Sequence, residues 1–213
     1  MALIIAIEKQ KRRPRVDVHL DGDLPFSLRL DLLAASSLLV GDDLSTFRRE
    51  ELQSEDQRLT AIESALRLLA VQPRSERDLA DRLRRRGLRR EAVDAAITRM
   101  REMGYLNDAA YAKFYVDARL AATPRSRRAL AFELGRKGVR RELADESLSD
   151  VSDGENAYQA AQRRLRALRG LDRQTFTRRL GSFLSSRGFG YGVARATIDR
   201  CWAEMAEEVF DRF

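Results

Sequence analysis

The chain has 213 residues, of which 44% are hydrophobic and 34% charged, with a formal net charge of +7 at neutral pH. Few aromatic residues and many alanine, leucine and arginine residues favour a soluble, mainly helical protein. The longest apolar stretches are too short to cross a bilayer and the N-terminus lacks a secretory signal pattern, so we expect a cytoplasmic protein without membrane contact.

Residues 1–56 differ from the rest in pattern and charge. The apolar run from Leu3 to Ile7 and the alternating Val16-Asp-Val-His-Leu20 predict strands, and Asp21-Gly22 predicts a tight turn between strands. A short helix is expected over residues 32–39, and Ser45 begins a capped helix. We expect a small extension made of a β-hairpin and short helices.

From about residue 57 one phrase recurs three times, at intervals of about 50 residues. Its form is Leu-x-x-x-Leu-x-x-basic-Gly-apolar, and its glycines are Gly87, Gly138 and Gly188. The first two copies also share Pro-Arg-Ser, starting at Pro73 and Pro124. A period of this length predicts one supersecondary unit repeated and stacked on its neighbours, in residues 57–107, 108–152 and 153–208.

Each repeat is predicted to contain three helices. Ser75 and Asn107 are placed to cap helices, and the three glycines to end the middle helices in the left-handed conformation. The fold expected is a mainly α, elongated and curved stack of three tandem three-helix repeats. Repeated apolar and aromatic positions should form its core; they include Leu79, Leu83, Ile97, Tyr111, Phe114, Tyr115, Leu120, Leu130, Leu134, Leu148, Phe176, Leu180, Leu184, Ile198 and Trp202.

Positive charge is concentrated in the first and third repeats. Residues 57–107 carry 12 basic and 7 acidic side chains, and residues 157–203 carry 10 and 2, whereas residues 1–56 carry 8 and 11. A solvated helical surface could explain the first excess. The ten arginines of residues 157–203 would repel one another unless a polyanion or an acidic protein face lies nearby.

Three helices with a glycine turn also describe a helix-turn-helix. The helix after the turn would begin at Arg89-Arg90-Glu91, at Arg140-Arg141-Glu142 and at Gly190-Tyr191-Gly192. The third copy lacks the basic pair, so contact with the phosphate backbone is favoured over sequence reading.

Catalytic and metal chemistry find little support in the sequence. It has no phosphate loop with a following lysine, and the glycine-rich Gly188–Gly192 segment is interpreted as a turn. Cys201 is the only cysteine and His19 the only histidine, which excludes an internal disulfide and a Cys/His metal cluster within one chain. We therefore expect no enzyme activity, cofactor or metal, and a structural or incidental place for both residues.

One stretch of the second repeat resembles a known family. The segment Gly104-Tyr-Leu-Asn-Asp-Ala-Ala-Tyr-Ala112, with Pro124-Arg-Ser and the phrase from Leu130 to Val139, closely resembles the central signature of the RecX family. The resemblance covers residues 60–205 strongly and the N-terminal extension weakly.

The resemblance implies a non-enzymatic modulator of the RecA recombinase, most simply an inhibitor. Such a protein would lie in the groove of the RecA filament on single-stranded DNA and restrain strand exchange, ATP hydrolysis and co-protease function. DNA binding is expected to be weak and independent of sequence, with double-stranded DNA left open; a monomer is favoured, with oligomeric state also open. Charge alone selects the expected contact residues: Arg84, Arg85, Arg86, Arg89, Arg90, Arg125, Arg127, Arg128, Arg163, Arg164, Arg166, Arg169, Arg178 and Arg179.

Two alternatives stay open. A DNA-binding helical-repeat regulator that acts directly on nucleic acid would bind naked DNA tightly and prefer a sequence. A purely structural scaffold would do neither, and would leave the charge of the third repeat unexplained.

Overall fold

The computed structural model describes residues 1–210, which form two compact units. The first contains residues 1–73 and 79–106, and the second contains residues 74–78 together with the chain from Asn107 onward. No helix within residues 1–210 is both long enough and apolar enough to span a membrane.

The N-terminal part is a four-stranded antiparallel sheet, which is larger than the hairpin we expected. Its order is β3-β2-β1-β4, with β1 at Ala2–Lys9, β2 at Arg15–Leu20, β3 at Asp23–Arg29 and β4 at Asp43–Leu44. The predicted turn joins β2 to β3, and Gly22 there has a φ of 70°. The short β4 could not be predicted because two residues carry no periodicity; it is held by pairing with Ala2 and Leu3.

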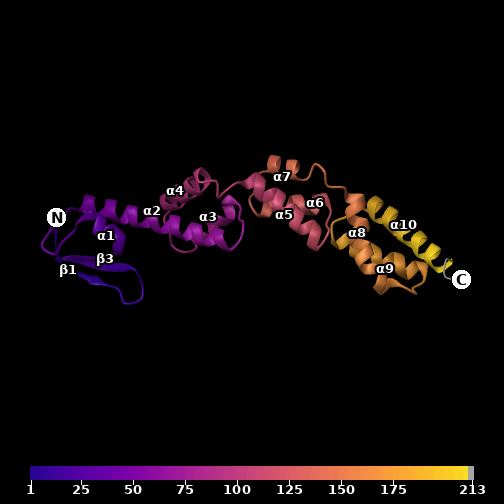
Figure 1. Ribbon diagram of the computed structural model, residues 1–213, viewed down its shortest axis with the longest axis horizontal. Coiled ribbons are helices and arrows are strands. Elements are labelled where there is room, and N and C mark those ends of the chain that lie inside the picture. The colour runs from indigo at the N-terminus through magenta and orange to yellow at the C-terminus, as the bar shows by residue number, and fades with distance from the viewer. Residues whose placement is uncertain (211–213) are drawn as a thin grey trace. The chain divides into compact units, whose positions relative to one another are not determined.

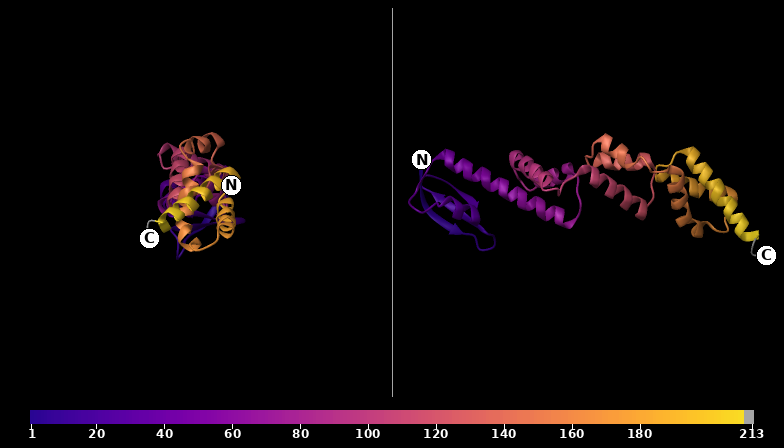
Figure 2. Two further views of the ribbon diagram at one scale, coloured as in Figure 1. Left: turned by 90° about the vertical axis from the view of Figure 1, so that its right-hand side faces the viewer. Right: turned by 45° about the horizontal axis from the view of Figure 1, so that its top comes forward.

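One face of this sheet is covered by helix. The alternating Val16, Val18 and Leu20 of β2 are buried, as period-2 patterning requires. They join a core with Leu52 of α2, a helix that spans Thr46–Val71. The sheet lies beside the N-terminal part of α2 (Figure 2), and the short α1 at Leu30–Ser36 follows β3.

Helix α2 packs against the sheet with its N-terminal half and forms the first helix of the first repeat with its C-terminal half. Ser45 caps it as predicted, accepting a hydrogen bond from the Arg48 N–H at 3.1 Å. The helix then continues for 26 residues, so the expected boundary between residues 56 and 57 falls inside it. The buried Asp56 ties the sheet to this helix, because its carboxylate bonds Arg15 of β2 at 2.7 Å.

The first three-helix unit consists of the C-terminal half of α2 with α3, Glu76–Arg84, and α4, Arg90–Glu102. Gly87 ends the middle segment with a φ of 79°, as predicted. The predicted apolar faces of α3 and α4 are buried against α2 in one cluster. Its large members are Leu79, Leu83, Leu88, Val93, Ile97, Met100 and Leu106.

The second and third three-helix units repeat this arrangement (Figure 1). The second has α5 at Asp108–Ala122, α6 at Arg127–Arg136 and α7 at Arg141–Ser147. The third has α8 at Asp153–Leu165, a 3₁₀ turn at Arg166–Leu168, α9 at Arg173–Ser186 and α10 at Tyr191–Phe210. Each unit has its own buried cluster, so the prediction of three tandem three-helix domains is confirmed.

One predicted core residue is wrong. Phe114 of α5 is 52% exposed, while its neighbours Tyr111 and Val116 are buried. The spacing favoured Phe114 because α5 carries apolar residues around much of its circumference. A helix that packs along one stripe leaves some of them in solvent.

The serine of each Pro-Arg-Ser segment contacts the following three-helix repeat. The buried Ser126 caps α6 by accepting from the Ala129 N–H at 3.1 Å, and its own N–H donates to the Arg187 carbonyl at 3.2 Å. The buried Ser75 caps α3 in the same way and donates its hydroxyl hydrogen to the Lys137 carbonyl. Each serine therefore lies at the left-handed glycine turn of the next repeat.

Candidate functional site

The arginines predicted in the first repeat lie at the end of α3 and the start of α4, and all are exposed. Arg84 pairs with Asp81 at 3.1 Å, and Arg90 lies 3.6 Å from Asp94. Such exposed pairs within one helix add little stability. In the part of the chain that the structure describes, Arg85, Arg86 and Arg89 have no carboxylate partner, so their charge is available to a binding partner.

The predicted arginines of the second repeat separate into two kinds. Arg127 and Arg128 begin α6 and are exposed. Arg125 is partly buried and bonds Glu133 at 2.9 Å. Glu133 also lies 2.9 Å from Arg119 and accepts from the Tyr115 hydroxyl at 2.6 Å. Arg125 therefore belongs to an internal network.

Burial and the hydrogen bond to Glu133 raise the pKa of the Tyr115 hydroxyl. The phenol consequently stays protonated and remains a donor to the carboxylate. The same network raises the pKa of Arg119, with the Tyr115 hydrogen bond as the main cause. The charges of Arg119 and Arg125 are thus met by one carboxylate.

In the third repeat, Arg163 and Arg164 both lie on α8 but contact different groups. Arg163 donates to the carbonyls of Ala121 and Ala122 at 3.0 and 2.6 Å, which satisfies the C-terminal end of α5. The Arg164 guanidinium lies 4.9 Å from the centre of the Phe183 ring. The structure places Arg164 beside Arg187, a residue that charge counting did not select, which lies 4.5 Å from the same ring centre.

The other predicted arginines of this repeat are on its surface. Arg166 begins the 3₁₀ turn and Arg169 follows it, and Arg178 and Arg179 lie on α9; all four are exposed. Within residues 1–210, Arg166, Arg178 and Arg179 have no carboxylate partner. The structure does not gather all fourteen predicted residues into one site.

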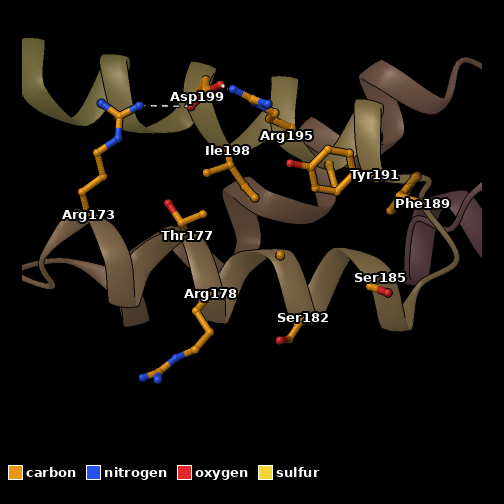
Figure 3. Close-up of a pocket in the computed structure, with 12 residues that line it drawn as sticks. Arg173, Thr177, Arg178, Ser182, Ser185, Phe189, Tyr191, Arg195, Ile198 and Asp199 are labelled. Carbon is orange, nitrogen blue, oxygen red and sulfur yellow. Dashed lines mark hydrogen bonds and ion pairs between the residues drawn. The ribbon is translucent and has the colours of Figure 1, made fainter.

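A groove of about 630 Å³ runs between α9 and α10, and Arg178 of α9 is among its lining residues, with its guanidinium pointing away from α10 (Figure 3). Phe189, Ala194 and Ile198 supply buried apolar side chains to it, and Thr177, Ser182 and Ser185 of α9 are among its other lining residues.

Charged and aromatic groups lie at the groove's opposite ends. At one end Asp199 pairs with Arg173 at 3.2 Å and with Arg195 at 4.0 Å. Tyr191, at the other end, is 80% exposed (Figure 3). An apolar floor with a basic edge suits an amphipathic partner segment that carries acidic groups.

Exposed aromatics were missed by the sequence reasoning. Besides Phe114 and Tyr191, Tyr105, Phe132 and Phe47 are each more than half exposed. Periodicity could not separate them from core aromatics because only packing decides which apolar stripe of a helix is covered. No three His, Cys, Asp or Glu side chains among the described residues are grouped as a metal site requires.

The three-helix units match three profiles of one family along the chain. The first, second and third three-helix domains of RecX match residues 61–100, 107–148 and 152–198. The "Regulatory protein RecX" of Streptomyces lividans is 39% identical over 146 residues, which cover 67% of this chain and 78% of that protein. That of Lactobacillus delbrueckii subsp. bulgaricus is 31% identical over 212 residues, covering 98% and 78%.

Solved structures agree with these matches. A crystal structure of regulatory protein RecX aligns with a TM-score of 0.64 at 25% identity and covers 93% of this chain and 100% of its own. RecX from Lactobacillus salivarius has a similar fold, with a TM-score of 0.60 at 19% identity over 68% of this chain and 97% of its own.

Tandem three-helix domains with many exposed arginines define a helical-repeat protein with a basic surface. The chain belongs to the RecX family, whose members are regulatory proteins.

Proposed function

We propose that this protein is a non-enzymatic modulator of the RecA recombinase. It binds the RecA filament on single-stranded DNA, lies in the filament groove and restrains strand exchange, ATP hydrolysis and co-protease function in the cytoplasm. Membership of the RecX family supports a regulatory role. The observation that carries the proposal further is the charge of the third three-helix domain, in which the exposed Arg178 and Arg179 of α9 have no carboxylate partner among the described residues.

Such a surface favours a partner that presents acidic side chains or phosphate groups. Complementary charge raises the rate of encounter and selects the partner. The groove between α9 and α10 adds an apolar floor next to the exposed Arg178, which would give affinity that salt removes only in part. A RecA filament on single-stranded DNA would present protein side chains and phosphate groups together.

Charge reversal on α9 tests this proposal. In the double variant Arg178→Glu/Arg179→Glu, we expect binding to RecA filaments on single-stranded DNA to weaken about tenfold or more at low salt and less at high salt. Arg12→Glu/Arg13→Glu is the matched control, because both arginines are exposed in the β1–β2 loop without a carboxylate partner among residues 1–210. Equal affinity of the α9 variant and the wild type would remove α9 from the interface.

A second function is favoured by the helices that follow the glycine turns. Arg140 and Arg141 are exposed at the start of α7, where a helix-turn-helix protein would contact DNA. A regulator acting directly on nucleic acid would bind naked duplex DNA tightly and prefer one sequence. Binding measured on several unrelated duplexes separates the two functions, since the RecA modulator binds all of them weakly.

A further inference from the structure

Two arginines, Arg164 and Arg187, lie over the Phe183 ring, and the charges of Arg125 and Arg163 reach Arg187 as well. Arg125 precedes α6, Arg163 and Arg164 come from α8, and Arg187 follows α9. The Arg187 guanidinium feels the positive charge of the other three, and its pKa is lowered by burial first and by these like charges next. Four cations within electrostatic reach of each other raise the free energy of this part of the fold.

Two of the four charges are offset inside the protein. Arg125 bonds Glu133 at 2.9 Å, although Glu133 also serves Arg119. Arg163 donates to the carbonyls of Ala121 and Ala122 at the end of α5, where the helix dipole is negative.

The other two charges have no such offset. Arg164 and Arg187 have no carboxylate partner in the described part of the chain, and Arg187 makes only a long 3.5 Å hydrogen bond to the Pro124 carbonyl. Both guanidinium groups lie over the Phe183 ring, at 4.9 and 4.5 Å from its centre. The ring therefore holds two like charges close together with most of their donors free.

A third observation marks this location. The Nε atom of Arg125 is buried and has no hydrogen-bond partner in the described structure. Buried donors normally find an acceptor, and one left without a partner needs an explanation. Solvent does not reach this Nε atom, but an oxygen-rich anion beside the partly exposed Arg125 and Arg187 side chains would supply counter-charge to both.

We propose that Arg164 and Arg187, supported by Arg125 and Arg163, form a binding site for a phosphate group. A tetrahedral phosphate offers oxygens in several directions and more negative charge than one carboxylate, so it can accept from both guanidinium groups at once. Because the two guanidinium groups already cover Phe183, the site takes the phosphate of a nucleotide chain without stacking a base on that ring.

The phosphate has two sources that share this chemistry. One is a backbone phosphate of single-stranded DNA, and this source rests on the function proposed above. The other is a free phosphate or pyrophosphate ion. Binding of either ligand can be measured without RecA. Failure of the phosphate site and failure of the RecA role are therefore separate results.

The test compares Arg164→Gln/Arg187→Gln with the wild type and with Arg12→Gln/Arg13→Gln, which removes the same charge from the exposed β1–β2 loop. Binding of pyrophosphate is followed by calorimetry, and binding of an oligothymidylate by fluorescence anisotropy, at one ionic strength. We expect the site variant to lose about tenfold or more in affinity for at least one ligand, and the control to lose far less. The ligand affected identifies the source.

Stability distinguishes a binding site from a structural cluster. Removing two repelling charges should leave the melting temperature of the site variant unchanged or higher in the absence of ligand. A clear fall in melting temperature would mean that the arginines serve the fold. Unchanged affinity of the site variant for both ligands would overturn the phosphate site. So would binding of polyglutamate that depends on Arg187 and is tighter than binding of oligothymidylate.

Discussion

The hydroxyl oxygen of Ser126 lies 2.6 Å from the position that a Cβ atom on Gly188 would occupy. The Cβ atom of Ala129 is 2.9 Å from the same position. Gly188 therefore has two duties: its φ of 88° ends the α9 segment, and its lack of a side chain admits the start of α6. Gly138 is in the same situation, with the side chain of Arg77 against it, whereas Gly87 has no such neighbour.

Gly188→Ala should consequently cost more than backbone strain alone. We expect a loss of about 3 kcal/mol in the free energy of unfolding, of which about 1–2 is left-handed strain and the rest the clash with Ser126. Gly170→Ala is the control, because its φ is 77° but nothing lies within 4 Å of the added atom. Equal losses in urea unfolding would show that the close approach does not matter.

Ser126→Ala removes the cap of α6 at a buried position. The N–H of Ala129 loses its acceptor, and we expect a destabilisation of about 1 kcal/mol. Ser182→Ala, at an exposed position on α9, should change stability by less than about 0.5 kcal/mol. Chemical denaturation of both variants checks this, and a loss no larger for Ser126 than for Ser182 would contradict the capping role.

Glu133→Gln tests the network that holds Arg119 and Arg125. We expect a destabilisation of about 2 kcal/mol, because one carboxylate serves both guanidinium groups and is itself largely buried. Affinity for pyrophosphate should rise at the same time, since Arg125 loses its counter-charge. Glu142→Gln, an exposed change on α7, is the control for both measurements; the account fails if the two variants behave alike.

Cys201 should be unreactive in the folded protein. Its side chain is fully buried in the third repeat, and burial is the main cause that raises the pKa of its thiol to about 11. The thiolate is the reactive form, so alkylation by iodoacetamide at pH 8 should be at least about a hundredfold slower in buffer than in guanidinium chloride. Comparable rates would show that α10 opens readily.

The ion pair between Arg29 and Glu63 predicts a small pH dependence. The hydrogen bond from Arg29 lowers the pKa of Glu63 below its ordinary value of 4.5, so its stabilisation is present above pH 4.5 and is lost as pH falls through the folded-state pKa. Because the Glu63 side chain is half exposed, the effect should stay below about 1 kcal/mol. Glu63→Gln should be less stable than the wild type at pH 7 and equal at pH 2.

Sequence patterning predicted the helices of the repeats well because their signals are local. Ser75, Asn107 and the three glycines specify caps and turns through their own backbone chemistry, and the structure confirms them. Leucine periodicity likewise placed Leu79, Leu130 and Leu180 in the core. These features depend on residues within one helix turn.

Contacts between segments that are distant in the chain could not be predicted from the sequence. The joint of Ser126 with Gly188, and the approach of Arg164 to Arg187 across Phe183, join residues that no local pattern relates. Charge counting selected Arg125 and Arg163 but could not show that internal acceptors engage them. It overlooked Arg187, which looked like only the basic position of the repeated phrase.

The proposed regulation of RecA is tested most directly by the RecA-dependent ATPase rate on single-stranded DNA. We predict that this protein suppresses the rate at levels well below one molecule per RecA monomer, while binding naked DNA only weakly at the same salt. An unchanged ATPase rate together with tight binding to naked DNA would contradict the account and assign the function to a regulator that acts directly on nucleic acid.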